Sequence, residues 1–242
     1  MIIKPIKTRV FQEGDDLVAF ITDYFKKLSE KSVVVITSKI VALAEKRTAL
    51  AGSKKAKEAL IRKESDWAIQ TKYTWLTVKD GMVMAAAGID ESNADGKCIL
   101  LPKDSYGSAE KIRTALRRIF KVRDLAVLIT DSRIMPLRAG ITAVATGYAG
   151  FSGIRDYRGS PDIFGRIMKI SRTNIADSLA TAAVIEMGEG SEQRPLALIT
   201  GASNIEFRNN IDRHEVEIDI TDDMYAPFFK SARFKKKYKK NN

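Results

Sequence analysis

The stretch VVVIT, residues 33 to 37, is the segment that decides the fold. It is a continuous β-branched run without alternation of polar and apolar side chains, which is typical of a strand buried on both faces of a sheet. A second run of this kind, AVLIT, occupies residues 126 to 130. Both runs stop abruptly on polar residues, so we expect two buried strands whose ends carry chemistry.

The remaining segments predict helices and strands that mix without strict alternation. Apolar residues at helical spacing predict helices over 15–31, 53–70, 108–121 and 174–187, with Ser108 as a cap and Gly188 as a stop. Residues 73–89 read as a hairpin that turns at 79–81, and PLALIT at 195–200 reads as one more strand. We therefore predict an α/β fold (α+β mixed), with mixed sheets and flanking helices, and place a possible subdomain boundary near 139–150.

Composition narrows the classes of function. The chain has 242 residues, a net charge of +11, one cysteine (Cys98) and one histidine (His214). A single cysteine excludes an internal disulfide framework and a multi-cysteine zinc site. His214 lies among charged residues, so we interpret it as a surface residue rather than a catalytic base. Such a composition favours chemistry carried by carboxylates, metal ions and cationic side chains.

No stretch of the sequence approaches the length of a membrane span, and the first residues lack the apolar core of a signal peptide. We therefore expect a cytoplasmic protein with no membrane partner. The positive charge is concentrated in the lysine-rich segment 230–242. Such a run binds nucleic acid or simply stays solvated, so a nucleic-acid-binding protein is one alternative interpretation.

Polar side chains follow three of the apolar runs. VVVIT ends on Ser38 and Lys39, VMAAAGI ends on Asp90 to Asn93, and AVLIT ends on Asp131 and Ser132. Open α/β sheets place ligand sites outside the carboxyl ends of their strands, and hard cations prefer oxygen ligands. Together these ends suit a nucleotide with a divalent metal, whereas each one alone also fits a turn or a helix cap. Neither a Walker loop nor a GxGxxG fingerprint occurs.

Two further segments carry candidate binding residues. Residues 147–166 interleave glycines with Arg155, Arg158 and Arg166, and a guanidinium matches a carboxylate or phosphate in two-point fashion. We interpret this segment as a binding loop, with a surface loop of ion pairs as the alternative. MGEGSEQ, at 187–193, places Glu189 and Glu192 just after a helix end, either as mere termination or as a further source of metal ligands.

These residues, taken in order, resemble the glutamate ligases that act on coenzyme F-420. The likeness covers residues 1 to about 201. It is carried by EGDDL (13–17), VITSKIVALAE (35–45), AGIDESN (87–93), LLPKDSYGSAEKIR (100–113), VLITDS (127–132), IRDYRGSPDIFGR (154–166), ADSLATAA (176–183) and MGEG (187–190). The charged segment 202–242 takes little part.

The resemblance implies an enzyme that joins L-glutamate to an acidic acceptor through an amide bond, driven by GTP (or ATP) with two magnesium or manganese ions. Asp90 and Asp131 match ligands of one metal, and Ser132 and Glu189 match ligands of the second. The positions that match nucleotide contacts are Thr8, Arg9, Val10, Phe11, Ser38, Lys39, Asn93, Met187, Gly188, Glu189 and Gly190. The resemblance also implies an intertwined homodimer, and residue type alone suggests Arg155, Arg158 or Arg166 as clamps for substrate carboxylates.

The sequence departs from the family pattern at two places. The family commonly continues after Thr-Asp with Thr-Phe/Asn-Gly-Arg, whereas this chain has Ser132-Arg133-Ile134-Met135-Pro136. The family's lysine shortly after the strand-end serine is Leu43 here, so one phosphate contact is missing or is supplied elsewhere. The first departure resembles a divergent subgroup assigned to folate-type glutamylation. The acceptor thus stays open among an F-420 precursor, a folate and a glutamyl chain, with a metal-dependent phosphohydrolase as a further alternative.

Overall fold

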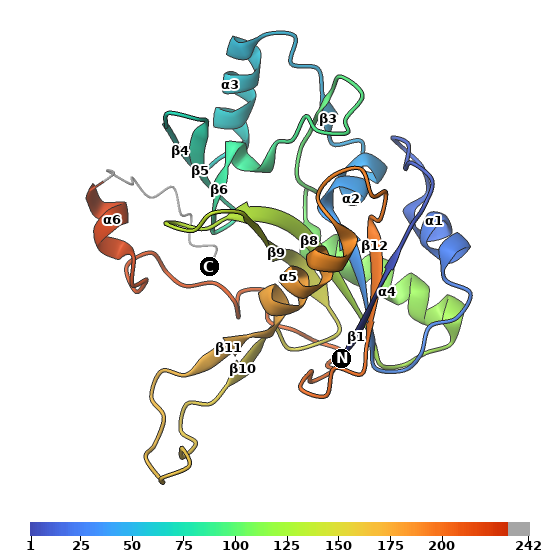
Figure 1. Cartoon of the computed structure of the whole chain (residues 1–242), viewed down its shortest axis with the longest axis vertical. Helices are drawn as coiled ribbons and strands as arrows, with labels where there is room; N and C mark the ends of the chain where they lie inside the picture. Colours follow the sequence, from blue (N-terminus) through green and yellow to red (C-terminus); the bar gives the residue numbers. More distant parts are fainter. Residues whose placement is uncertain (232–242) are drawn as a thin grey trace. The chain divides into compact units, whose positions relative to one another are not determined.

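The computed structural model describes residues 1–231, which divide into two units (Figure 1). Unit 1 comprises Met1–Arg47 and Pro102–Val216, and unit 2 comprises Thr48–Leu101 together with the segment from Glu217 onward. Most of the lysine-rich segment singled out above, residues 232–242, lies outside the described residues. None of the helices described over residues 1–231 has the length and apolar character needed to cross a membrane.

Unit 1 is built on a five-stranded mixed sheet in the order β1-β12-β2-β8-β9. The strands are β1 (Ile2–Ile6), β12 (Leu196–Thr200), β2 (Ser32–Thr37), β8 (Leu125–Ile134) and β9 (Ile141–Ala149). Only β2 and β8 pair in parallel, and the other neighbours are antiparallel. The two β-branched runs are therefore adjacent central strands, as the α/β prediction requires, and the mixed α/β fold class is confirmed.

Helices cover both faces of this sheet. One face packs against α1 (Leu17–Tyr24) and α4 (Ser105–Phe120), where Val34, Ile36 and Val127 meet helix residues such as Phe20 and Leu116. The other face packs against α5 (Ile175–Met187), whose small side chains include Ala176, Ala180 and Ala183 (Figure 1). Because β2 and β8 are covered on both sides, their apolar run is continuous rather than alternating. The short helix α2 (Ser38–Ala44) follows β2 directly.

Unit 2 has a smaller core of its own. A three-stranded antiparallel sheet is formed by β4 (Trp67–Gln70), β5 (Trp75–Lys79) and β6 (Met82–Ala85), and β3 (Thr48–Ala49) pairs with β7 (Cys98–Ile99). The helices are α3 (Lys54–Glu64), the 3-10 turn η1 (Ala86–Gly88) and α6 (Ala226–Ser231). Ile61, Trp75, Ile89 and Leu100 form the core. The predicted hairpin is confirmed, and its turn uses positive φ at Asp80 and Gly81.

Several predicted boundaries were wrong, each for a local reason. The first helix ends at Tyr24, and Phe25 and Leu28 are buried without being helical. The helix predicted over 53–70 stops at Glu64, because Ser65 is extended and Trp67–Gln70 pairs as β4. Helix α4 begins at Ser105 and is capped by Asp104, which accepts from the Gly107 N–H at 2.9 Å. Ser108 lies one turn inside and donates to Glu45 at 2.6 Å instead.

The carboxyl half of β8 also differs from expectation. The strand runs on through Asp131 and Ser132 to Ile134, because β9 pairs with it along this whole stretch as a hairpin. Residues 139–150, where a possible boundary was expected, therefore lie inside unit 1 and supply a strand of its sheet. The two units instead separate after Arg47, Leu101 and Val216.

Strands β10 (Ile154–Asp156) and β11 (Arg172–Asn174) form a two-stranded ribbon, and residues 157–171 join them. We call residues 154–174 the arm, which extends away from the sheet of unit 1 (Figure 1). Its loop carries four exposed apolar side chains: Ile163, Phe164, Ile167 and Ile170.

Gly147 on β9 is a point where α4 and the sheet meet at very close range. A Cβ at this position would lie 2.5 Å from the Ser105 carbonyl carbon and 2.6 Å from the Tyr106 nitrogen, both backbone atoms at the start of α4. We expect Gly147→Ala to lower the free energy of unfolding by about 1–3 kcal/mol, because rigid backbone must move to accept the methyl group. Urea unfolding measures this loss. The matched variant Gly52→Ala meets nothing within 4 Å, and equal stability of the two variants would contradict the expectation.

Candidate active site

The parallel pairing of β2 with β8 brings two predicted residues together. Thr37 of β2 lies opposite Thr130 of β8, so the next residues along the two segments are Ser38 and Asp131. The buried Ser38 hydroxyl donates to Oδ1 of Asp131 at 2.8 Å. The expected meeting of these two strand ends is therefore present, although β8 itself continues past it. A carboxylate and a hydroxyl thus stand at the edge of the sheet where α/β proteins bind ligands.

Ser132 and Glu189 form the second part of this edge. The Ser132 hydroxyl donates to the Glu189 carboxylate, 2.7 Å from either oxygen. Glu189 follows α5 directly, since the helix stops at Gly188 with a φ of 83°. Adjacent residues of one strand point to opposite faces of a sheet. Asp131 and Ser132 thus present oxygen ligands on the two sides of the same strand. We call Ser38, Asp131, Ser132 and Glu189 the strand-end cluster.

The glycine-rich segment after α5 is folded around Glu192. The Gly190 N–H donates to the Glu192 carboxylate at 2.8 Å, and a Cβ on Gly188 would lie only 2.4 Å from the carboxyl carbon of Glu192. Glu192 therefore folds back onto this turn instead of reaching the strand-end cluster, and the φ of 83° at Gly188 favours glycine there. The side chain of Met187 is buried in the core, so a ligand meets this residue only through its backbone.

The segment from Thr8 to Phe11 lies beside the same loop. The Thr8 N–H donates to the carbonyl of Gln193 at 3.0 Å, as expected from the pairing of β1 with β12. Arg9 pairs with Asp15 at 2.6 Å and stacks over Phe20, and Val10 is exposed. Phe11 is a core residue in edge contact with Phe20, so its side chain is structural. Two segments matched to nucleotide contacts are thus neighbours in unit 1, and Lys39 is the second residue of α2.

Asp90 and Asn93 belong to unit 2, where Asp90 is held firmly. Its backbone forms a two-hydrogen-bond bridge with Ile99, and its carboxylate accepts from the N–H and the hydroxyl of Ser92, both at 2.7 Å. Asn93 is exposed with a φ of 51°, a conformation that asparagine tolerates well. The residues matched to metal and nucleotide contacts are therefore contributed by both units.

The donor set of the strand-end cluster fits a hard divalent cation. Among residues 1–231, no group of three or more Asp, Glu, His or Cys side chains converges tightly enough to enclose a metal by itself. Magnesium is ordinarily held by one or two carboxylates, with substrate phosphates and water completing its shell. Asp131 on one side of β8, and Glu189 with the Ser132 hydroxyl on the other, each supply one carboxylate to that pattern, in which phosphate oxygens and water complete the shell.

Arg133 is a residue whose importance the sequence interpretation missed. It lies two residues beyond Asp131 on β8, its side chain is only 5% exposed, and its Nη1 contacts Oδ2 of Asp131. Nη1 also donates to the carbonyl of Ser132 at 2.9 Å. In the sequence it is a departure from the family pattern, two residues after Asp131. The signal available was the alternation of β8, which places residues 131 and 133 on one face.

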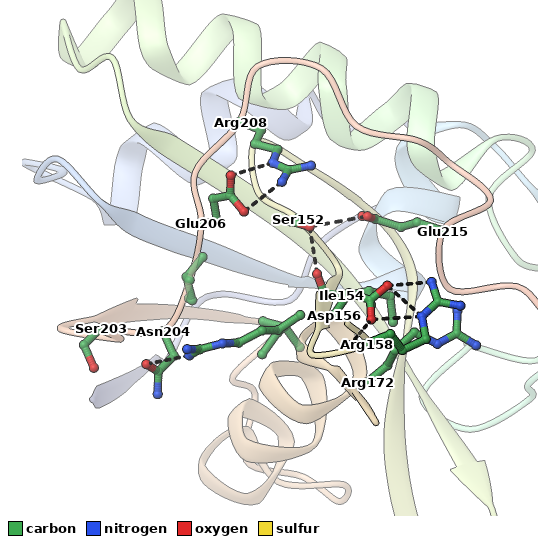
Figure 2. A pocket seen from close by; sticks show the side chains of 13 residues that line it. Ser152, Ile154, Asp156, Arg158, Arg172, Ser203, Asn204, Glu206, Arg208 and Glu215 are labelled. Atoms are coloured by element: carbon green, nitrogen blue, oxygen red, sulfur yellow. Dashed lines mark hydrogen bonds and ion pairs between the residues drawn. The ribbon is translucent and has the colours of Figure 1, made fainter. Parts of the chain in front are cut away.

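The arginines proposed as substrate clamps lie elsewhere in unit 1. Arg155 and Arg158 line a cavity of about 780 Å³, shown in Figure 2, together with Arg172 and Arg208. Arg155 donates to Asn204 at 3.0 Å, and Arg158 holds Asp156 through several hydrogen bonds, which lower the pKa of that carboxyl to about 2. Arg166 lies in the arm, outside the lining of the cavity, and its N–H donates to Asp162.

The direction of β9 explains why these arginines are remote from the strand-end cluster. β9 runs antiparallel to β8, and its last residue, Ala149, pairs with Val127. Val127 precedes Asp131 by about 13 Å of strand, at roughly 3.3 Å per residue. The segment that directly follows Ala149, which includes Arg155 and Arg158, therefore leaves β9 at the end of the strands opposite to Asp131. Within one chain the structure does not bring Arg155 or Arg158 to Asp131, and the assignment of Arg155, Arg158 and Arg166 as substrate clamps stays a prediction.

The opposite edge has a polar network of its own. Glu215 accepts from the hydroxyl of the buried Tyr148 at 2.7 Å and from the Gly153 N–H at 2.6 Å. Burial, together with the hydrogen bond to Glu215, raises the pKa of the Tyr148 hydroxyl. His214, next to it in sequence, is exposed, as predicted. These contacts attach the segment after β12 to the sheet and involve none of the predicted metal ligands.

Comparison with known proteins shows the family of the chain. The family model described as "F420-0:Gamma-glutamyl ligase" matches residues 5–201. A protein named "Coenzyme F420:L-glutamate ligase" from Methanothermobacter thermautotrophicus is 36% identical over 211 residues, covering 78% of this chain and 83% of that protein. A protein of the same name from Methanopyrus kandleri is 34% identical over 216 residues, with 81% and 84% covered. The matched region spans both units and every residue of the strand-end cluster, and the chain belongs to the F420-0:gamma-glutamyl ligase family.

Proposed function

We propose that this protein is a nucleotide-dependent ligase that forms an amide bond between L-glutamate and a carboxylate of an acidic acceptor. The observation that carries the proposal is the strand-end cluster, in which Ser38 holds Asp131 and Ser132 holds Glu189 at one edge of the sheet. Membership of the glutamyl ligase family supports the reaction class. The relatives' names support an F-420 precursor as the acceptor, with a folate or a glutamyl chain as alternatives raised by the departures at Arg133 to Pro136.

The proposal assigns GTP, or ATP, to the edge formed by Thr8–Phe11, Ser38, Lys39 and residues 187–190, with Asn93 contributed by unit 2. Two divalent ions, magnesium or manganese, are assigned to Asp90, Asp131, Ser132 and Glu189. When bound, such ions neutralise charge on the transferring phosphate and orient it. The exposed backbone of the turn at Gly188–Gly190 and the ammonium of Lys39 contribute donors for phosphate oxygens in this scheme.

The reaction proceeds in two displacements. A carboxylate oxygen of the acceptor attacks the γ-phosphorus, the bond from that phosphorus to the bridging oxygen breaks, and nucleoside diphosphate leaves. The amine of glutamate then attacks the carbonyl carbon of the acyl phosphate and loses a proton, and inorganic phosphate leaves. Phosphoryl transfer of this kind depends on positioning and charge neutralisation more than on a protein nucleophile. A chain with one histidine and one buried cysteine is suited to it.

A mass-spectrometric assay tests the proposed function. The protein is incubated with GTP or ATP, manganese, L-glutamate and separate acceptors: an F-420 precursor, folates, and glutamate itself. We expect one of these acceptors to gain a glutamyl unit in step with phosphate release. Nucleotide hydrolysis without any glutamylated product would instead support a phosphohydrolase. Deleting residues 231–242 tests the alternative of a nucleic-acid-binding protein. If RNA binding is lost while ligation persists, that segment is an accessory to the ligase.

The arm supports a homodimer as part of the proposal. A two-stranded ribbon of three residue pairs has little stability of its own, yet its loop exposes Ile163 and Phe164 at 91% and 89%. Clustered exposed apolar side chains mark interaction surfaces. We assign a second copy of this chain as the partner that covers them, as the family resemblance implies.

Phe164→Asp is expected to convert the dimer to monomers, because a carboxylate replaces an apolar group that the interface would bury. Sedimentation velocity measures the change. The control is Ile185→Asp, which places the same charge on the exposed face of α5, and it is expected to leave the dimer intact. A dimer that persists in Phe164→Asp would exclude the arm from the interface.

A further inference from the structure

Only one of the three guanidinium nitrogens of Arg133 has hydrogen-bond partners among the described residues. Its Nη1 contacts Oδ2 of Asp131 and donates to the carbonyl of Ser132. Its Nε and Nη2 are buried, and neither has a hydrogen-bond partner within the described part of the chain. A guanidinium stays charged at every physiological pH, and native proteins rarely leave such donors unsatisfied away from water. These two buried, unpaired donors therefore require an explanation.

The two unsatisfied nitrogens belong to one recognition edge. In a guanidinium, the Nε–H and one Nη2–H point in the same direction and form a fork that matches two oxygens of a single anion. Arg208 shows this fork filled by protein, with Nε and Nη2 donating to the two carboxylate oxygens of Glu206 at 2.9 and 2.8 Å. Arg133 presents the same edge, but neither Nε nor Nη2 has an acceptor among the described residues.

A purely structural arginine in this protein looks different. Arg113 is also buried, and each of its three nitrogens has a partner: Nε donates to the carbonyl of Leu125, Nη1 to Glu110 and Nη2 to Asn209. Arg133 is buried to a similar degree, but its hydrogen bonds to described residues come from Nη1 alone, and Asp177 interacts with it only through charge. Burial alone thus does not account for Arg133, because the same fold satisfies another buried guanidinium completely.

We propose that Arg133 is a substrate-binding residue that takes one carboxylate or phosphate group through Nε and Nη2 while Nη1 remains on Asp131. Its position on β8, two residues past Asp131, places this fork at the ligand-binding edge of the parallel pair. The identity of the anion rests on the proposed function. It is either the terminal phosphate of the nucleotide or a carboxylate of glutamate or the acceptor, and both present the paired oxygens that the fork requires.

The test compares Arg133→Lys, which keeps the charge but removes the fork, with the control Arg208→Lys, whose fork is filled by Glu206 at the opposite edge. Titration with fluorescent GTP and GDP measures nucleotide binding, and steady-state kinetics measures KM for glutamate and the acceptor. A phosphate ligand predicts that Arg133→Lys weakens GTP about tenfold or more while GDP changes less than about threefold. A carboxylate ligand predicts unchanged nucleotide binding and a KM for glutamate or acceptor raised about tenfold.

Anion binding by the wild-type protein provides a readout that does not depend on ligase activity. In NMR spectra of arginine Nε–H groups, inorganic phosphate, GTP or L-glutamate is expected to shift one buried resonance, which Arg133→Lys or Arg133→Gln removes. Binding constants and KM values of Arg133→Lys within about twofold of wild type, with no Nε–H response to any anion, would overturn the proposal. An Nε–H response without any glutamylated product would retain the anion site and reject only the ligase assignment.

Discussion

Replacing Asp131 with asparagine is expected to reduce nucleotide turnover by about 10³-fold or more, because the change removes a charge that the proposed metal site requires. The side chain keeps its size, so the fold should persist. Its Oδ1 still accepts from Ser38, as the aspartate does at 2.8 Å. The new amide N–H₂ then faces Nη1 of Arg133, where Oδ2 stood, and two donors meet. The variant therefore loses a metal ligand and the anchor of Arg133 together.

Phosphate release under saturating nucleotide, glutamate and metal measures this effect, and circular dichroism checks the fold. Asp104→Asn is the matched control, since it makes the same chemical change at the cap of α4. Asparagine caps helices as well as aspartate does, so this variant should turn over at the wild-type rate. Asp131 would be removed from the mechanism if its asparagine variant released phosphate as the wild type does.

The sequence predicted the structure best for the two parallel strands that are buried on both faces of the sheet. VVVIT and AVLIT read as buried strands, and in the structure they lie side by side with Thr37 opposite Thr130. Once the two are parallel, their carboxyl ends must lie at one edge, so the meeting of Ser38 with Asp131 follows from topology. This part of the site was predictable because it depends on strand direction and not on any loop.

Other strands depend on pairing with distant segments, which the local pattern of apolar and polar residues does not reveal. Asp131 and Ser132 looked like the end of a strand, because polar residues interrupt the apolar run. They are nevertheless strand residues, since β9 supplies partners for their backbone as far as Ile134. In the same way, Trp67–Gln70 continues the composition of α3 but pairs with β5. Backbone pairing with a distant segment outweighs local propensity in both cases.

The location of the predicted arginine clamp depends on topology. Gly-rich sequence and three arginines correctly indicated an unusual segment between β9 and α5, but its location depends on which way β9 runs. An antiparallel β9 carries Arg155 and Arg158 to the edge opposite Asp131. Conversely, Arg133 stands in the sequence as a positive charge just after Asp131, and only the structure shows that its guanidinium is buried against that carboxylate.

Glu189→Ala is expected to raise the magnesium or manganese concentration needed for half-maximal turnover by about 10- to 100-fold. The variant removes one of the two carboxylates of the strand-end cluster in unit 1 and leaves the Ser132 hydroxyl without the acceptor it has at 2.7 Å. Asp131 keeps both of its contacts, to Ser38 and to Arg133, so the remaining ligand stays in place. Weakened metal affinity with turnover largely restored at high metal is therefore the expected pattern.

Turnover is measured against manganese concentration after chelation, and electron paramagnetic resonance of free manganese gives binding without activity. Glu186→Ala is the control, because it removes an exposed carboxylate three positions earlier, on the last turn of α5. If Glu189→Ala needed no more manganese than the wild type, Glu189 would not be a metal ligand. Its hydrogen bond with Ser132 would then serve to hold the loop after α5 in place. In that case Asp131 would be left as the metal carboxylate of unit 1, and the remaining ligands would have to come from unit 2 and the nucleotide.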